Sequence, residues 1–321
     1  MSGSMTRRDF LAGAAAVGLG IGGAAGAAPK KSGFKTTLHK ALIMGKIGDA
    51  GCESLKKAGF EGIECGAWSV KPDDAVAGRK IAERYGLRIH SVLRGWTNFN
   101  KPGSVEKDIA SVTTALKAAE GYGADALLLV PCRTGGAMPK PWEFDYEFDE
   151  KTCHVTRVAK GDNSKYADYI KAQNQATDAS RSALEKLIPV AEKTKVVIAL
   201  ENVWNNLWVR PDLFAAFVRS FRCKWIQTYF DIGNHVKYAP PEQWIRALGK
   251  TIVKLHVKDF KLNPDGRGGK FCNIRDGSVN WPSVRKELDK IGYNGWMTIE
   301  GSGKLSMAER NKRLDLIVAG K

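Results

Sequence analysis

The sequence predicts a single α/β domain, a (β/α)8 TIM barrel, and three observations support this prediction. Residues 40–318 alternate short apolar runs with amphipathic stretches, as parallel βαβ units do. Eight such runs occur, and about 280 residues is a usual length for a barrel of eight units. A doubly wound open sheet is the rival fold, but no Gly-x-Gly-x-x-Gly motif follows the first run.

The apolar runs are short enough for strands, and several are continuous in Val, Ile, Leu and Ala, as strands buried on both faces are. The expected strands are residues 41–44, 62–65, 88–93, 126–131, 196–201, 227–231, 251–257 and 296–300. The clearest expected helices are residues 73–85, 105–122 and 166–193. Further helices are expected to begin beside Pro211, Pro241 and Pro282, because the first turn of a helix does not need the N–H that proline lacks.

One stretch interrupts the alternation. Residues 132–165 follow the fourth expected strand, are rich in Gly, Pro and aromatic residues, and have no clear period. In a barrel this segment lies on the carboxyl-terminal face, where active sites form, and loops of this length are usually lids or disordered. Trp142, Phe144, Tyr146 and Phe148 alternate along it, which favours an ordered lid or hairpin.

The first 27 residues have the features of a signal peptide. The stretch 6–11, Thr-Arg-Arg-Asp-Phe-Leu, precedes a weakly apolar run of Ala and Gly that ends in a small-residue cleavage site. The paired Arg7 and Arg8 resemble the twin-arginine type. We expect export to the periplasm or another extracytoplasmic space, with residues 28–39 as a lead-in to the barrel. We expect no stable membrane insertion after cleavage, and an uncleaved anchor is the alternative.

Charge and cysteine content argue against several functional classes. Lys and Arg number 50 and Asp and Glu 34, for a net charge of +16. The basic residues are scattered and no nucleic-acid-binding motif is present, so we expect a solvated basic surface and no nucleic-acid partner. The six cysteines form no Cys-x-x-Cys pair, which argues against a zinc ribbon and favours free thiols. Whether Cys132 and Cys153 bridge the lid is left open.

Ionisable side chains stand at the ends of several expected strands. They are Glu64, His90, Glu201, Asp231, His256 and Glu300. A barrel gathers the carboxyl ends of its strands around one axis, so side chains far apart in the sequence converge on one pocket. A charged group directly after an apolar strand is costly unless it is paired or bound to a metal.

The last four strand ends supply three carboxylates and one imidazole, a set rich in hard oxygen ligands. It suits one divalent metal ion, Mn²⁺ or Mg²⁺ above all, with Co²⁺ or Zn²⁺ tolerated. Any one of these residues, taken alone, could instead be an ion pair or a helix cap. Because all four stand at successive strand ends, the sequence predicts a metal site formed by Glu201, Asp231, His256 and Glu300.

Four short motifs carry a resemblance to a known family. They are Glu-Asn-Val-Trp-Asn-Asn at 201–206, Phe-Asp-Ile-Gly-Asn at 230–234, His-Val-Lys-Asp-Phe at 256–260 and Thr-Ile-Glu at 298–300. In order and spacing they resemble sugar phosphate isomerase/epimerase proteins of the xylose-isomerase-like TIM-barrel group. The resemblance implies that Glu201, Asp231, His256 and Glu300 are the metal ligands. It also implies that Glu201 and Glu300 are the catalytic acid and base that move a proton beside a sugar carbonyl.

Seven further residues are candidates for substrate binding. They are His90, Glu64, Trp204, Asn205, Asn234, His235 and Lys258. Each has a structural alternative: His90 as a core histidine, Glu64 as a partner of Arg94, Trp204 as packing, and Lys258 as part of a structural pair with Asp259. The loop 263–277 has Arg-Asp-Gly at 275–277, where many relatives have Gly-Glu-Gly.

We therefore expect a metal-dependent isomerase or epimerase of a sugar or sugar derivative, acting through an enediolate. The alternative is a metal-dependent lyase or glycoside-cleaving enzyme that acts on a keto-sugar with the same site. An endonuclease IV-like activity has little support, because it needs several more zinc-binding histidines than the five present. A sugar-binding protein without turnover, and pairing into a homodimer, are left open.

Overall fold

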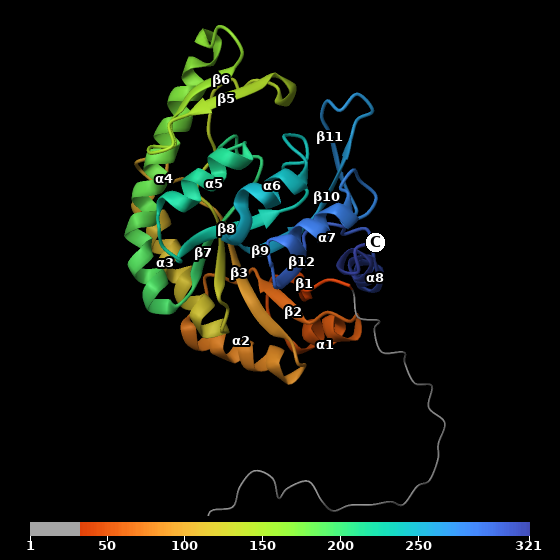
Figure 1. Ribbon diagram of the computed structural model, residues 1–321. Helices are drawn as coiled ribbons and strands as arrows, with labels where there is room; N and C mark the ends of the chain where they lie inside the picture. The colour runs from red at the N-terminus through yellow and green to blue at the C-terminus, as the bar shows by residue number, and fades with distance from the viewer. Residues whose placement is uncertain (1–32) are drawn as a thin grey trace, which may run out of the picture. The chain divides into compact units, whose positions relative to one another are not determined.

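Eight parallel strands close into a barrel in the computed structural model, which describes residues 33–321 (Figure 1). The barrel strands are β1 (Leu38–Met44), β2 (Gly62–Cys65), β3 (Arg88–Trp96), β4 (Ala126–Val130), β7 (Val197–Glu201), β8 (Ile226–Asp231), β9 (Ile252–Val257) and β12 (Gly295–Ile299). Around the barrel their order is β1-β12-β9-β8-β7-β4-β3-β2. The prediction of a single-domain TIM barrel is confirmed. The predicted signal peptide lies outside the described residues.

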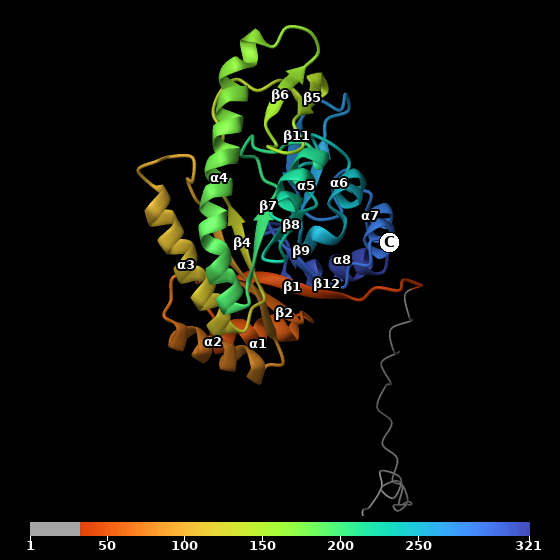
Figure 2. The same ribbon diagram turned by 60° about the vertical axis from the view of Figure 1, so that its left-hand side comes forward.

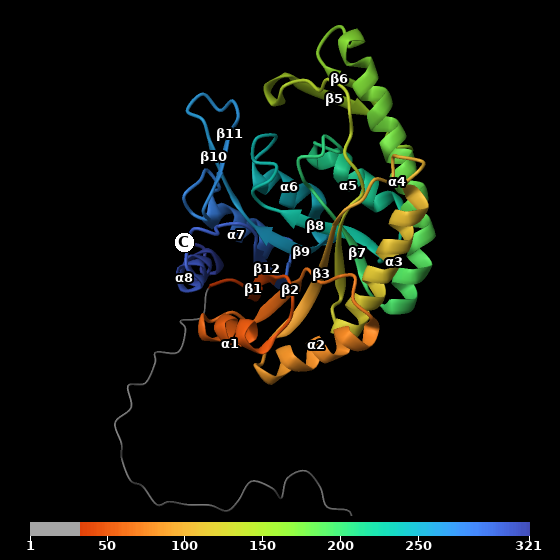
Figure 3. The same ribbon diagram turned by 180° about the vertical axis from the view of Figure 1, so that it is seen from behind.

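Eight helices surround the strands (Figures 2 and 3). They are α1 (Asp49–Lys57), α2 (Pro72–Arg84), α3 (Val105–Tyr122), α4 (Ala167–Thr194), α5 (Pro211–Ser220), α6 (Pro241–Leu248), α7 (Trp281–Lys290) and α8 (Met307–Val318). As expected, α5, α6 and α7 each have proline in the first turn, where the missing N–H has no intrahelical partner to lose. Among residues 33–321 no helix is both long and apolar enough to cross a membrane.

The strands bury one set of side chains against the helices and the other set inside the barrel. On β4, for example, Leu127 and Leu129 belong to the large core between barrel and helices. Ala126, Leu128 and Val130 belong instead to a smaller cluster inside the barrel. This alternation is the period of two that every strand has. All six cysteines are free thiols, as expected.

Two antiparallel hairpins rise from the carboxyl end of the barrel (Figure 1). The first pairs β5 (Phe144–Phe148) with β6 (Val155–Ala159), and its segment begins with the short 3-10 helix η1 (Pro141–Glu143). It lies within the segment that the sequence marked as a lid or hairpin, and the long helix α4 extends up to it (Figure 2). The second pairs β10 (Asp259–Leu262) with β11 (Gly269–Cys272). We did not predict this second hairpin, because its glycine-rich turn resembles a loop.

The third barrel strand is longer than predicted. We expected it to end at residue 93, but β3 continues to Trp96 and pairs with β4 as far as Val130. The pairing shifts register between Leu93 and Gly95, which is where the regular pattern of the sequence is lost. As a consequence, His90 is the third residue of a nine-residue strand and lies toward the amino end of the barrel.

Candidate metal centre

Four side chains from consecutive barrel strands meet at the carboxyl end of the barrel. Glu201 ends β7, Asp231 ends β8, His256 lies on β9 and Glu300 directly follows β12. One ligand atom from each lies within 4.8 Å of those from the others. The four residues singled out in the sequence as a metal-binding set are therefore brought together.

The strand period places these side chains inside the barrel. On β7, Ile198 and Leu200 pack outward against the helices while Ala199 faces inward, so Glu201 also faces inward. On β9, Leu255 and Val257 pack outward, which turns His256 into the barrel. The same reasoning holds for the residues after Phe230 on β8 and Ile299 on β12.

The His256 ring bridges two sets of carboxylates. Its Nδ1 atom lies 3.0 Å from Glu201 Oε1, 2.9 Å from Glu300 Oε2 and 4.0 Å from Asp231 Oδ2. Its Nε2 atom lies 2.5 Å from Glu64 Oε2. A carboxylate on one ring nitrogen fixes the orientation of the ring and leaves the other nitrogen to bind a metal. Nδ1 is therefore the candidate ligand atom, and Glu64 is its positioning partner.

Lys258 supplies a positive charge next to the cluster. Its Nζ atom lies 2.9 Å from Glu300 Oε2 and 3.4 Å from Asp231 Oδ2, and it donates a hydrogen bond to Asn234 Oδ1. It therefore contacts two of the predicted ligands. The neighbouring Asp259 has a different role, since its carboxylate accepts hydrogen bonds from the backbone N–H groups of the loop 275–279.

Burial and charge shift the pKa values of the cluster in opposite directions. Burial raises the pKa of Asp231 to about 7 and also raises the pKa of Glu201. Burial alone would raise the pKa of Glu300 as well, but the charges of His256 and Lys258 lower it. Conversely, burial would lower the pKa of His256, whereas Glu64 and the other acids around the ring hold it well above its usual value.

The charge balance of the site fits a divalent cation. Four carboxylates, counting Glu64, face one lysine ammonium and one imidazole. Asp231 Oδ2 is buried and has no hydrogen-bond partner among the described residues. A buried carboxylate oxygen without such a partner is costly, and a hard metal ion would satisfy it. Glu201, Asp231, His256 and Glu300 are thus suited to hold one divalent ion.

The sequence from residue 52 to residue 315 matches the profile of the family described as xylose isomerase-like TIM barrel. The chain belongs to this family. Over 135 residues it is 28% identical to L-ribulose-5-phosphate 3-epimerase of Escherichia coli, which covers 41% of this chain and 45% of that protein. The chain thus spans less than half the length of the curated relatives it matches.

Solved structures show the same fold at low sequence identity. The IOLI protein, crystallised with a bound zinc atom, superposes with a TM-score of 0.65 at 14% identity, over 88% of this chain and 98% of that one. D-allulose 3-epimerase from Methylomonas sp., in complex with D-allulose, gives a TM-score of 0.60 at 18% identity, over 89% and 96%. At these identities the likeness establishes the fold alone.

In this xylose isomerase-like barrel, Glu64 has a partner that the sequence did not reveal. We expected it to contact a sugar or to pair with Arg94. It is fully buried and its carboxylate contacts His256. Arg94 donates to Ser111 and lies over the ring of Trp68. The pairing with Arg94 is therefore wrong.

Three other candidates lie outside the cluster. His90 stacks on Trp296 and its Nε2 contacts Thr298 Oγ1, below the site. Asn205 donates to Cys132 O and accepts from the backbone N–H of Leu207, so it shapes its own loop. His235 is buried and its Nε2 contacts Val203 O. None of these three side chains contacts the four-residue cluster.

Trp204 and Asn234 lie beside the cluster. The Trp204 indole N–H donates to Asn234 O, and the backbone N–H of Asn234 donates to Asp231 Oδ1 at 2.7 Å. Sequence reasoning missed Asn202, whose side chain accepts from the backbone N–H of Asp231 and donates to its carbonyl. Its place directly after Glu201 was the available signal. These contacts hold the Asp231 carboxylate in position.

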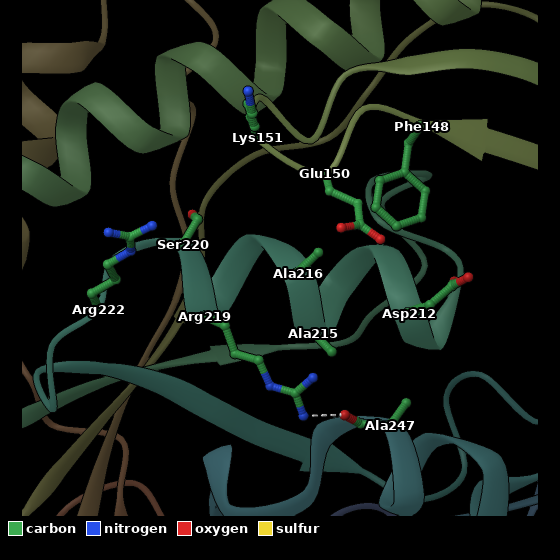
Figure 4. Close-up of a pocket in the computed structure, with 10 residues that line it drawn as sticks. All are labelled: Phe148, Glu150, Lys151, Asp212, Ala215, Ala216, Arg219, Ser220, Arg222 and Ala247. Carbon is green, nitrogen blue, oxygen red and sulfur yellow. Dashed lines mark hydrogen bonds between the residues drawn. The ribbon is translucent and has the colours of Figure 1, made fainter.

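A cavity of about 870 Å³ lies elsewhere, beside α5 and outside the barrel (Figure 4). It is lined by Phe148 at the end of β5, by Glu150 in the turn that follows, and by Ala215 and Arg219 on α5. Arg219 donates to Ala247 O at one edge. None of the four cluster residues lines this cavity, so its size does not make it the active site.

His235 makes folding of this family member sensitive to acid. Burial lowers its pKa to about 3, while an unfolded histidine titrates near 6.5. The unfolded chain therefore binds one more proton below pH 6.5, and stability falls as the pH drops from there toward 3. Titration of His235 lowers the free energy of unfolding by about 1.4 kcal/mol for each pH unit in this range.

The matched variant is His235→Gln, which does not titrate and can still donate to Val203 O. The free energy of unfolding of the parent and of the variant is measured by urea titration of the metal-free proteins at pH 7.5 and 5.0. We expect the parent to lose about 2 kcal/mol more than the variant across this interval. Equal losses would show that His235 is not kept neutral by the fold.

Proposed function

We propose that this protein is a metal-dependent isomerase or epimerase of a sugar or sugar derivative, working by proton abstraction beside a carbonyl. The observation that supports this most strongly is the placement of two carboxylates around one candidate metal site. The barrel order β12-β9-β8-β7 puts Glu300 and Glu201 on opposite sides of His256 and Asp231. The two relatives named above as epimerases agree with the proposal.

The chemistry needs stabilisation of negative charge and a place for one proton. A divalent ion, when bound, would polarise the carbonyl and hydroxyl oxygens of a sugar. One of the two glutamates removes the proton on carbon, which leaves an enediolate, and a carboxyl group returns a proton to carbon or oxygen. Asp231 and His256 would help to hold the ion and would take no part in the proton transfer. Lys258, 2.9 Å from Glu300, keeps that carboxylate ionised and fixes its direction.

Exchange of a sugar C–H with solvent deuterium tests this proposal. The protein from residue 28 onward is incubated in deuterated buffer with Mn²⁺ and a panel of ketoses, 3-keto-sugars and 3-keto-glycosides. We expect deuterium to enter one position beside the carbonyl of at least one compound. Exchange with a changed configuration indicates an epimerase, and loss of a substituent indicates the lyase alternative. No exchange on any compound, with metal bound, would contradict the proposal.

We also propose that the protein is exported, on the basis of residues 1–27 alone. Replacing Arg7 and Arg8 together with lysine is expected to reduce export by at least about 10-fold, because the pair is the sorting signal of the twin-arginine route. Cell fractionation with an antibody against the barrel measures the distribution. The parallel control is Lys30→Arg with Lys31→Arg, just beyond the signal. Equal amounts of parent and Arg7/Arg8 variant outside the cytoplasm would refute the assignment.

A further inference from the structure

Aromatic rings with a cation over each of them gather at the carboxyl end of the barrel. The pairs are Arg94 over Trp68, Arg133 over Trp96, Arg267 over Trp142, Lys237 over Trp204 and Lys258 over Phe271, at 3.5–5.2 Å from the ring centroids. Trp96 is the last residue of β3, and the other four aromatic residues lie in segments that follow β2, β4, β7 and β9. They therefore belong to the loops on the face where the candidate metal centre lies.

Several of these rings remain exposed despite their cations. Trp96 is 44% exposed, Phe271 44% and Trp142 52%. Among the described residues the only other large hydrophobic side chain with comparable exposure is Val76, on α2. Exposed aromatic side chains that cluster at one end of a protein usually mark a binding surface. Packing of the fold does not account for them, because about half of each of these three residues remains exposed.

Three of the rings are linked by side-chain contacts to the candidate metal centre. Arg133 lies over Trp96 and donates a hydrogen bond to the carbonyl of Trp204 at 2.8 Å. Trp204 contacts Phe271, with ring centroids 4.9 Å apart. Lys258 lies over Phe271 and also contacts Glu300. We call Trp96, Arg133, Trp204 and Phe271 the aromatic rim. Lys258 alone lies between this rim and Glu300 of the proposed acid/base pair.

The chemistry of the rim matches a sugar ring that carries a negative charge. The C–H face of a pyranose stacks on indole and phenyl rings, and the hydroxyl groups at its edge reach neighbouring polar groups. The guanidinium of Arg133 offers a planar pair of donors that suits a carboxylate. Lys237 over Trp204 and Lys258 over Phe271 place two further positive charges beside the rim.

We propose that the aromatic rim binds a second sugar unit, one that bears a carboxylate, while the first unit lies at the Glu201–Glu300 cluster. The substrate class is then an acidic oligosaccharide or glycoside of at least two units. This inference rests on the proposed function for the identity of the first unit. Binding at the rim can nevertheless be measured without turnover, so the two proposals can fail separately.

Matched pairs of short saccharides provide the probes. Trigalacturonate is compared with α-1,4-galactotriose, and trimannuronate with β-1,4-mannotriose, by isothermal titration with the Mn²⁺-loaded protein. We expect at least one acidic member to bind at least about 10-fold more tightly than its neutral counterpart, as a desolvated charge-assisted contact would give. Polyglutamate of similar charge controls for general attraction to the basic surface, and we expect it to bind more weakly.

Variants then locate the binding. Trp96→Ala and Arg133→Gln are each expected to weaken binding of the acidic saccharide about 5- to 10-fold, in line with stacking and charged hydrogen bonds. The matched control is Lys224→Gln, which removes a cation lying 4.6 Å from the Trp225 ring just before β8, at the other end of the barrel. We expect this control to bind like the parent.

Two results would overturn the inference. One is a lack of preference for acidic saccharides, seen either as equal affinity for the acidic and neutral members or as stronger binding of polyglutamate than of the acidic saccharides. The other is unchanged affinity in both Trp96→Ala and Arg133→Gln. Deuterium exchange on a single keto-sugar, measured in the same variants, separates the two proposals. Retained exchange with unchanged saccharide binding would refute the rim alone, and absence of exchange in the parent would refute the proposed function.

Discussion

Deuterium exchange is expected to fall by at least about 10³-fold when either Glu201 or Glu300 is replaced by glutamine, because a positioned acid or base is lost. Each carboxylate lies within 3.0 Å of His256 Nδ1, and the two come from opposite sides of the site. An amide keeps the size of the side chain but cannot take a proton from carbon. The measurement is the exchange rate at saturating Mn²⁺, so that weaker metal binding is not mistaken for lost proton transfer.

Glu287→Gln is the matched control for these two variants. Glu287 is a buried carboxylate on α7 that pairs with the exposed Lys290 and Arg246. Its removal changes charge and local packing by a similar amount, away from the strand ends. We expect its exchange rate to stay within about twofold of the parent, because its partners are exposed cations and none of the four cluster residues pairs with it. A Glu201→Gln or Glu300→Gln enzyme that retained parental exchange would show that the glutamates are not the acid and base.

Glu64→Gln is expected to weaken metal binding about 10- to 100-fold, the usual effect of losing a carboxylate behind a histidine ligand. Glu64 is fully buried and its Oε2 lies 2.5 Å from His256 Nε2. The carboxylate fixes the orientation of the His256 ring and makes Nδ1 a stronger metal ligand. Titration of the metal-free protein with Mn²⁺ or Co²⁺ measures this affinity directly and needs no substrate.

Glu61→Gln serves as the comparison for Glu64→Gln. Glu61 contacts His39 Nδ1 at 2.7 Å, so the chain offers a second carboxylate–imidazole pair, exposed and at the amino end of the barrel. Its loss should leave metal affinity unchanged. If both variants bound metal as the parent does, Glu64 would be a packing residue and not a positioning one.

The four residues at the strand ends could be predicted because a short apolar run identifies each strand and so fixes the residue at its carboxyl end. Once Val-Val-Ile-Ala-Leu is recognised as a buried strand, Glu201 must stand at its carboxyl end, and the same holds for Asp231 and Glu300. A barrel brings such ends together whatever the loops do. The confirmed fold and the convergence of these side chains therefore depend on patterns within five or six residues.

The remaining features depend on contacts between distant segments. Glu64 contacts His256 because β2 and β9, which are separated by β1 and β12 around the barrel, both direct a side chain inward, and no local pattern shows this. His90 was misplaced because Arg94, Gly95 and Trp96 resemble a loop although they continue β3. The β10–β11 hairpin was missed for the same reason. The cations over Trp96 and Trp204 come from other loops, so the sequence alone could not assemble the rim.

Metal content of the purified protein tests the central claim most directly. The protein from residue 28 onward is incubated with Mn²⁺, freed of unbound ion and analysed by mass spectrometry, next to the Glu201→Gln/Glu300→Gln double variant. We predict about one ion per chain in the parent and almost none in the variant, since loss of two anionic ligands removes much of a hard-cation site. A parent that holds no ion, or a double variant that holds as much as the parent, would contradict the account.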